Sequence, residues 1–437
     1  MTPRHDRDGA GWLEPLARTI RALQVLVVLG AGLGLPAGAW AQAPDVAGSV
    51  GFELRGFPYT SIAGLPSEAT LSAVIRPEFE WEWDAGDQQL RFLPFFRVDQ
   101  TDEQRTHYDI RELIWIKRGD TWELAAGIGH VFWGVTESQH LVDIINQTDL
   151  VENPDGEDKL GQPMVNLTLL FDGGAISVFV LPGFRERTFP GIDGRFRPSL
   201  PIDSDLAFYE SGAQNRHVDF AIRWSHFIGD WDIGISHFHG TGREPTLVPL
   251  QAAVALQAGV GLGDVLAGSN DVPVDATLLP FYSIIDQTSM DLTAAKGDIL
   301  WKLEAINRFG QGERYAAATG GLEYTLVGAL GTSWDLGVLV EYLWDERGKA
   351  ALTNFDDDLF VGTRIAFNDM QSTDLLAGII IDRHTGSSLV NVELHRRIRE
   401  RYTLEIEARF FMGAGPKDRM FFFQGDDYVS VEISRYF

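Results

Sequence analysis

The 437-residue sequence predicts an all-β protein, a transmembrane antiparallel up-and-down β-barrel of about 18 strands, with 16 as the alternative count. Three observations predict this fold. Apolar and polar residues alternate along many segments, short and long connections alternate along the chain, and aromatic residues gather beside the short connections.

The alternation has a period of two, which places successive side chains on opposite faces of a strand. Clear examples span residues 71–84, 217–225, 334–342, 402–410 and 427–437. A soluble sandwich would point the apolar face inward and a membrane barrel would point it outward. The alternation alone therefore leaves both folds open.

The connections separate the two folds. Short ones are expected near residues 84–87, 118–120, 172–174, 228–230, 295–298, 328–333, 369–373 and 398–401. Long ones are expected near 57–69, 99–107, 131–162, 182–215, 240–282, 307–315, 345–357 and 412–427, with a brief exception near 383–387. Short periplasmic turns and long extracellular loops are typical of outer-membrane barrels. An even number of strands then places both termini in the periplasm.

Aromatic residues next to the short turns share the apolar parity of their strands. They are Trp83, Trp122, Trp231, Trp334, Tyr402 and Phe437. An aromatic row at one depth is the interfacial girdle of a membrane barrel.

The first 41 residues read as a secretory signal peptide. Arginines precede an apolar run over residues 22–35, and Ala39-Trp40-Ala41 offers a cleavage site. A transmembrane anchor is the alternative, but it needs about 20 apolar residues. Residues 42–437 are then one barrel domain.

Composition excludes several classes of site and partner. There is no cysteine, so disulfides, thiol nucleophiles and cysteine-bound zinc are excluded. The formal charge of −26 disfavours nucleic acid. We expect no cofactor and no metal, although acidic loops could bind divalent ions that also bridge lipopolysaccharide.

Two segments carry resemblances to known proteins. The last strand ends at Phe437 and resembles the signal by which the barrel-assembly machinery recognises Gram-negative outer-membrane barrels. The run Arg111–Gly129, followed by Trp133-Gly134, Asp143-Ile-Ile-Asn146 and Asp149-Leu150, resembles an uncharacterised porin-like family of proteobacterial outer-membrane proteins that carry a domain of unknown function. That family often has Pro where this chain has Gln147, so the turn there need not match.

The same segment opens the long loop 131–162. Asp143, Asn146 and Asp149 are candidates for a pore constriction, if this loop enters the lumen. The alternative is a surface loop held by its own polar side chains. Loops 182–215 and 240–282 are also expected to fold over or into the lumen.

Charged residues of the inward parity are candidates to line the pore. They are Arg76, Glu78, Glu80, Arg91, Arg97, Arg111, Asp219, Arg223, Glu341, Arg364, Arg397, Glu405, Glu407 and Arg409. Opposed basic and acidic rows would orient polar solutes. The alternative is mutual neutralisation across neighbouring strands.

Three further features of the sequence concern binding sites. Arg185, Arg187, Arg195 and Arg197 form the most basic stretch and could capture an anion or lipopolysaccharide phosphate, with a plain solvated loop as the alternative. A short helix is expected near residues 249–258. His237 and His239 share a strand face, but no third ligand lies nearby in the sequence, so no metal site is predicted.

Together these features predict an outer-membrane, porin-like channel for passive or facilitated uptake of small polar or amphipathic solutes. The alternatives are a binding or adhesion protein on a barrel anchor and a plugged transporter of hydrophobic ligands. No G-x-S-x-G nucleophile motif is present, and we expect no enzyme. The expected partners are outer-membrane lipid, lipopolysaccharide, the assembly machinery and a small solute.

Overall fold

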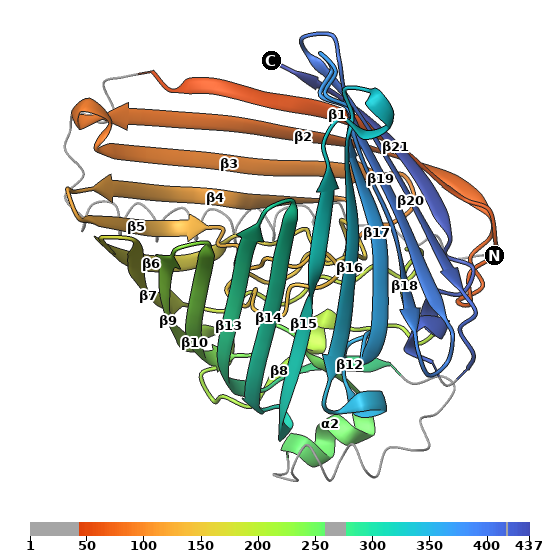
Figure 1. Cartoon of the computed structure of the whole chain (residues 1–437). Helices are drawn as coiled ribbons and strands as arrows, with labels where there is room; N and C mark the ends of the chain where they lie inside the picture. The colour runs from red at the N-terminus through yellow and green to blue at the C-terminus, as the bar shows by residue number, and fades with distance from the viewer. Residues whose placement is uncertain (1–42, 258–276, 417) are drawn as a thin grey trace, which may run out of the picture.

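The computed structural model describes residues 43–257, 277–416 and 418–437. Within these ranges, eighteen strands form one antiparallel sheet that closes on itself (Figure 1). The first strand, β1 (Asp45–Phe57), pairs with β2 (Glu68–Trp83) and with the last strand, β21 (Tyr428–Tyr436). The closing seam runs from Ser49 opposite Tyr436 to Gly56 opposite Val429. The predicted barrel of about 18 strands is confirmed, and the predicted signal peptide lies outside the described residues.

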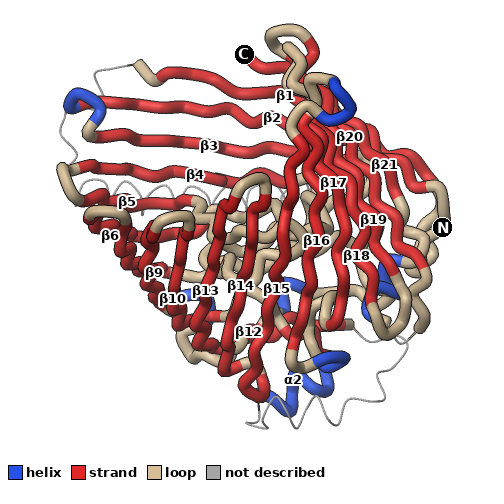
Figure 2. The backbone as a smooth tube through the Cα atoms, in the orientation of Figure 1, coloured by secondary structure: helices blue, strands red, loops and turns tan. Residues whose placement is uncertain are grey.

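The other strands of the barrel follow one another around the wall in chain order (Figure 2). They are β3 (Gln88–Asp99), β4 (His107–Arg118), β5 (Trp122–Gly129), β6 (Gln162–Phe171), β7 (Gly174–Pro182), β9 (Val218–Ile228), β10 (Trp231–Thr241), β13 (Ile284–Lys296), β14 (Ile299–Gly310), β15 (Gly312–Leu326), β16 (Asp335–Asp345), β17 (Asp357–Ala366), β18 (Asp374–Asp382), β19 (Ser388–Ile398) and β20 (Tyr402–Met412).

A small second sheet lies in the long connections. It contains β8 (Phe208–Tyr209), β11 (Thr246–Pro249) and β12 (Leu278–Tyr282), and α2 (Leu250–Gln257) follows β11 directly. Ala253 of the helix packs with Val248, Leu279 and Phe281. The short helix expected near residues 249–258 is therefore present, and it packs on its neighbours in the loop.

The exposed face of the barrel wall is apolar. In β1, Phe52 and Leu54 are exposed, whereas Glu53 and Arg55 between them are buried. Lipid cannot hydrogen-bond to the edge of an open sheet, so a membrane sheet has to close as this one does. The closed wall and its apolar outer face together make this a transmembrane barrel. No described helix is long and apolar enough to cross a membrane.

The short connections lie at one end of the barrel together with the C-terminus (Figure 1). Tyr436 donates its backbone N–H to Arg401 in the turn between β19 and β20, and Phe437 donates to Gly48. The aromatic residues Trp231, Trp334, Tyr402 and Phe437 are exposed at this end, while Trp83 and Trp122 are half-buried.

The prediction of one long connection is wrong. The connection expected near residues 307–315 is reduced to Gln311, because β14 runs to Gly310 and β15 begins at Gly312. Gly310 and Gly312 have φ of 105° and 87°. Positive φ is accessible to glycine at little cost, so the two glycines close a tight hairpin where polar residues suggested a loop.

Candidate functional site in the barrel lumen

The segment between β5 and β6, residues 130–161, enters the lumen; we call it the inserted loop. Asn146 ties its two ends together. The Asn146 side chain accepts the N–H of Val131 at 2.8 Å and donates to the carbonyls of Gly129 and Leu160, each at 2.9 Å. Asn146 is buried with all these groups satisfied, so it fixes where the loop leaves and rejoins the wall.

Two wall carboxylates hold the middle of the inserted loop. Glu304 of β14 accepts the N–H groups of Val135, Thr136 and Val142 at 2.7, 3.1 and 3.1 Å, and the Thr136 hydroxyl at 2.8 Å. Glu341 of β16 accepts the N–H groups of Glu137 and Ser138 at 2.9 and 2.8 Å. These N–H groups lie outside any strand, and the two carboxylates supply their acceptors.

Apolar contacts complete the attachment on this side of the barrel. Trp133, Val142 and Ile145 of the inserted loop form one buried cluster with inward side chains from β4 to β15. These wall residues are Ile114, Ala125, Met164, Phe179, Leu181, Ala221, Phe238, Ile285, Ile306, Tyr315 and Ala317. We call the wall from β4 to β16 the covered sector, because the loop lies against its inner face.

The returning half of the inserted loop reaches across to the opposite wall. Glu152 pairs with Arg97 of β3 at 2.8 Å, and Asp155 pairs with Arg409 of β20 at 2.7 Å. Arg409 also lies 2.8 Å from Glu407 and 3.5 Å from Glu393. The loop therefore crosses the lumen and divides it.

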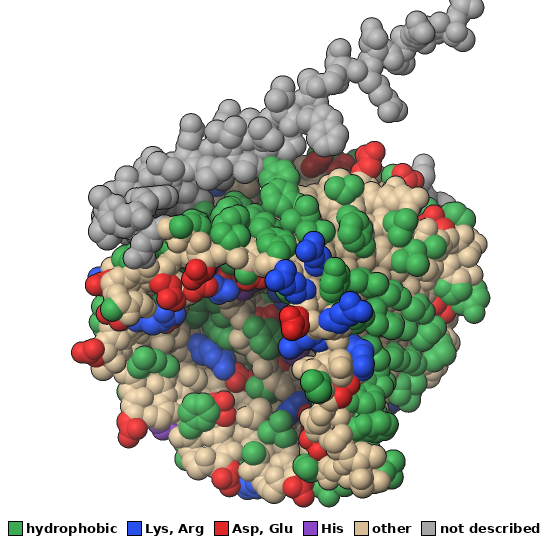
Figure 3. Space-filling model, turned by 90° about the horizontal axis from the view of Figure 1, so that it is seen from above, with side chains coloured by type: hydrophobic (Ala, Val, Ile, Leu, Met, Phe, Trp, Pro, Cys, Tyr) green, Lys and Arg blue, Asp and Glu red, His purple; other side chains and the backbone are tan. Residues whose placement is uncertain are grey.

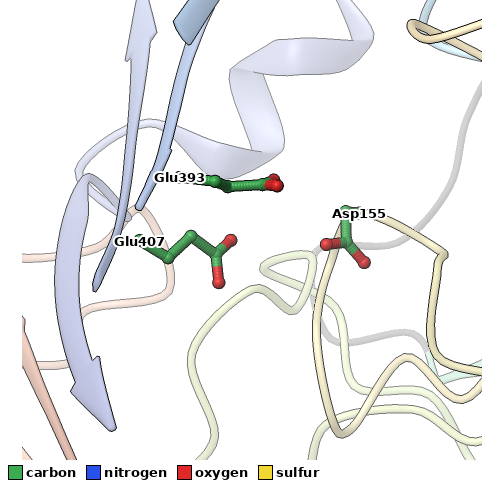
Figure 4. A group of neighbouring side chains, drawn as sticks. All are labelled: Asp155, Glu393 and Glu407. Carbon is green, nitrogen blue, oxygen red and sulfur yellow. The ribbon is translucent and has the colours of Figure 1, made fainter. Parts of the chain in front are cut away.

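Figure 4 shows the carboxylates of Asp155, Glu393 and Glu407 facing one another, with ligand atoms within 4.8 Å. Three carboxylates at such spacing could hold a hard cation. Here the Arg409 guanidinium pairs with all three and supplies the positive charge. We therefore assign this cluster to loop anchoring.

The remaining wall, from β17 through β21 and β1 to β3, we call the open sector. Several of its inward side chains are substantially exposed: Arg76 by 37%, Arg91 by 36%, Arg364 by 43% and Glu393 by 45%. By contrast, Glu304 in the covered sector has no exposure. Arg76 and Glu393 lie near the middle of their strands, so their exposure indicates open space in the lumen. Figure 3 shows a hollow in which acidic and basic side chains gather.

The predicted pore-lining residues divide between the two sectors. In the covered sector, Asp219 and Glu341 are buried, Arg111 pairs with Asp149 at 2.6 Å, and Arg223 pairs with Asp291 at 2.5 Å. Their charges are neutralised or hydrogen-bonded within the wall and the loop. Arg111 and Glu341 bind the inserted loop, whereas Arg223 pairs with another wall residue and Asp219 pairs with Arg243.

In the open sector, Arg76 pairs with Glu432 at 2.7 Å, Arg91 pairs with Glu112 at 3.0 Å, and Glu80 accepts a hydrogen bond from Gln89. Arg97 and Arg409 are buried and bind the loop, and Arg364 pairs with Glu137 at 2.5 Å. Tyr428 donates to Glu407 at 2.5 Å. The remaining candidates have no ion pair with any described residue; they are Glu78, Arg397 and Glu405.

The three residues predicted to form a constriction lie inside the loop and are engaged by other residues. Asn146 holds the base. Asp143 pairs with Lys159 at 3.2 Å, and Asp149 is buried against Arg111 and the Thr188 hydroxyl. Burial raises the pKa of Asp143 despite Lys159. Burial also acts on Asp149, but His107 and Arg111 hold its pKa well below the usual value. These side chains brace the loop and do not face open space.

The four arginines proposed to capture anions are also engaged by other residues. Arg185 pairs with Asp109 at 2.8 Å, and Arg187 donates to Gln147 at 3.2 Å. Arg195 pairs with Asp426 at 2.7 Å and donates to the carbonyls of Tyr59, Pro66 and Gly425, while Arg197 donates to the carbonyls of Ile192, Pro198 and Ser199. Arg185, Arg187 and Arg195 fasten the loop after β7 to its surroundings, and Arg197 braces that loop internally.

Sequence reasoning missed the importance of His140. Its ring nitrogens lie 3.3 Å from Glu157 and 3.7 Å from Glu304. Burial opposes the charged form, but the two carboxylates outweigh it and raise the pKa of His140 to about 10. The inward parity identifies Glu304 as a wall charge, but nothing in the sequence near it indicates the loop that it binds.

No family model and no curated protein matches this chain. Several solved structures are similar in fold. Wzi of Escherichia coli, described as a carbohydrate-binding outer-membrane β-barrel involved in group 1 capsule assembly, has a TM-score of 0.51 and 9% identity, covering 91% of this chain and 85% of its own. OccK11 of Pseudomonas aeruginosa has a TM-score of 0.51 and 10% identity, covering 90% and 95%. OccAB3 of Acinetobacter baumannii has a TM-score of 0.50 and 8% identity, covering 91% and 99%. At these identities the likeness concerns the fold alone.

Proposed function

We propose that this protein is a porin-like channel of the Gram-negative outer membrane that passes small polar or amphipathic solutes by passive or facilitated diffusion. One observation carries the proposal: inward charged side chains of the open sector are a third or more exposed inside a closed wall. A barrel of about 18 strands is too wide to be filled by its side chains alone. The inserted loop fills one side and leaves the other for water.

The charges of the open sector suggest how solutes are selected. Arg91 of β3 lies opposite Glu80 of β2, and β2 also carries Arg76 and Glu78. Arg76 is close enough to Glu405 of β20 for a Coulombic interaction, so both signs face the same space. Such an arrangement produces a transverse field that orients polar molecules as they pass. The inserted loop sets the width of the path, and its carboxylate contacts keep that width constant.

The proposed location follows the asymmetry of the connections. The end that carries the short turns and the C-terminus faces the periplasm, and the long loops face lipopolysaccharide outside. The final strand, which ends at Phe437, would be recognised by the barrel-assembly machinery. Transport through such a path needs no chemical step, in keeping with a protein that is not an enzyme.

Conductance of the purified full chain in planar bilayers tests the proposal. We expect steady ohmic current, and liposomes that contain the protein should swell in small polar solutes more slowly as solute size increases. Protein unfolded by heat before reconstitution is the control. A correctly folded barrel, verified by its heat-dependent electrophoretic mobility, that gives neither current nor swelling would overturn the proposal.

A further inference from the structure

Polar side chains interrupt the apolar outer face of the barrel on four neighbouring strands, β10 and β13 to β15 (Figure 1). The side chains of His237, His239 and Asp286 are 49%, 47% and 46% exposed. Phe238 between the two histidines packs into the cluster beneath the inserted loop, so both imidazoles point out of the barrel. We call this surface the polar patch; its members are His237, His239, Asp286, Thr288, Asn307 and Arg314. The proposed channel does not use it.

The polar patch is continuous across its strands. His237 lies opposite Thr288, and Thr288 lies opposite Asn307. His239 lies opposite Asp286, two residues farther toward the end with the long loops. Residues directly opposite one another in an antiparallel sheet share a face, so these five side chains point outward together.

The height of the polar patch places it beside lipid chains. Trp231 and Trp301 lie in one register row at the end with the short turns and are 37% and 46% exposed. His237 and His239 follow Trp231 on the same strand. At about 3.3 Å per residue and a strand tilt of about 40°, they lie roughly 15 and 20 Å above that row. The apolar band of an outer-membrane barrel is about 25 Å tall, so the polar patch lies in its outer half.

Exposed apolar side chains at the same height support this placement. Phe220 of β9 lies opposite His239 and is 50% exposed. Phe309 of β14 lies opposite Asp286 and is 59% exposed. Lipid that covers these rings also reaches the polar patch, where charged side chains that face lipid are unfavourable.

The polar patch carries charges of both signs on different strands. Asp286 accepts from His239 Nδ1 at 2.9 Å, and the imidazole turns its Nε2 away from this pair. Arg314 of β15 is exposed, and its Nε donates to Asn307 at 2.6 Å. Arg314 forms no ion pair with any residue that the structure describes. The carboxylate at one side and the guanidinium at the other therefore both lack a full counter-charge.

We propose that the polar patch is the contact surface between two copies of this chain. Both copies stand the same way up in the membrane, so a closed pair has its two-fold axis along the membrane normal. Such an axis places β10 and β13 of one copy against β15 and β14 of the other, at equal height. Arg314 then lies against Asp286 and His239 of the partner subunit, and the opposite charges leave lipid together. A second copy is the occupant that matches both signs at once, and the pairing does not depend on the channel.

The row beneath the polar patch allows the two walls to approach. Met290 of β13 lies opposite Ala305 of β14, and Ala305 lies opposite Ala318 of β15. Small side chains let backbones come close within a membrane, where packing and hydrogen bonds between segments drive association. Because the patch extends from β10 to β15, its centre lies between β13 and β14, and Ala305 should lie near the axis.

Cross-linking in isolated outer membranes tests the proposal. The chain has no cysteine, so Ala305→Cys introduces a single thiol beside the expected axis. Oxidation or a short bismaleimide should join two chains into a dimer on a denaturing gel. Val429→Cys is the matched control, because Val429 is 44% exposed on the outer face of β21, outside the patch, and should remain monomeric.

Charge variants in the Ala305→Cys chain test whether the polar patch holds the pair. Arg314→Ala or Asp286→Ala should slow cross-linking about tenfold. Arg383→Ala is the control, because this arginine is also exposed and pairs with Asp357 away from the patch, and it should not slow the reaction. Each variant is compared after its heat-dependent mobility shows a folded barrel.

Three outcomes would overturn the proposal. Folded Ala305→Cys could cross-link no faster than Val429→Cys. Arg314→Ala and Asp286→Ala could leave cross-linking unchanged. The chain could also stay monomeric and purify with lipopolysaccharide that Arg314→Ala releases, which would assign the polar patch to lipid.

Discussion

The covered and open sectors of the barrel share the same outward apolar face, but their inner faces differ. Under the inserted loop the wall presents Ile306, Phe238 and Ile285, together with Glu304, whose acceptors are occupied by loop N–H groups. In the open sector the wall presents partly exposed charges such as Arg76 and Arg364. On the inner face of this barrel, apolar and fully hydrogen-bonded side chains lie under the loop, and partly exposed charges lie where water reaches.

Carboxylates have different roles in the covered and open sectors. A buried carboxylate such as Glu304 is a structural acceptor, because an unpaired charge in a dry interior is strongly unfavourable. A carboxylate in the open sector such as Glu405 is hydrated and can act on a passing solute. The following predictions test this division, beginning with the largest effect.

Replacing Glu304 with Ala should give the largest effect. Four loop donors would lose their acceptor, so we expect a loss of about 3–5 kcal/mol in the free energy of unfolding. The freed loop should also change single-channel conductance and add current noise. Denaturant titration and bilayer recording measure the two effects. Unchanged stability and a quiet, unchanged current would mean that the loop does not depend on this carboxylate.

Arg97 and Arg91 on β3 form a matched pair of substitutions. Arg97 is buried between Glu152 and Glu53. Arg91 is 36% exposed, and its one ion pair with a described residue is with Glu112. Arg97→Ala should cost about 3–5 kcal/mol of unfolding free energy, and Arg91→Ala about 0–1 kcal/mol. Denaturant midpoints of the two variants provide the comparison, and equal losses would remove the distinction between buried and water-exposed charges.

The attachment of the inserted loop should weaken at alkaline pH. The pKa of His140 is raised from 6.5 to about 10, so its contribution is complete below about pH 6.5 and is lost as pH rises through about 10. Current noise should therefore increase between pH 7 and pH 10. His140→Gln should give recordings with little dependence on pH over that window, and an unchanged pH profile in this variant would assign the effect to other groups.

Glu405→Gln should have the smallest effect. The residue makes no ion pair with a described residue, so we expect a stability change within about 0.5 kcal/mol. Loss of a negative charge beside the path should shift the reversal potential in a salt gradient toward anion permeation. An unchanged reversal potential in the folded variant would place Glu405 outside the conducting path. An unfolded barrel would instead show that Glu405 has a structural role.

The sequence predicted the barrel and the face of each strand because these depend on a two-residue period, which is local. The roles of the loop residues depend on distant partners. Val135 binds Glu304, and Arg195 binds Asp426, at separations of 169 and 231 residues. No local pattern in the sequence indicates such pairs. From the sequence, the charged loop residues were therefore predicted to be available to a solute. In the structure they form ion pairs and hydrogen bonds that hold the loops.

Cysteine accessibility tests most directly whether water and ions follow the open sector. The chain has no cysteine, so single cysteines can be introduced without background. We predict that a charged methanethiosulfonate reagent reduces the current of Glu405→Cys and leaves that of Thr319→Cys unchanged, because Thr319 is fully buried in the covered sector. Reduction of the current in Thr319→Cys with none in Glu405→Cys would contradict the account.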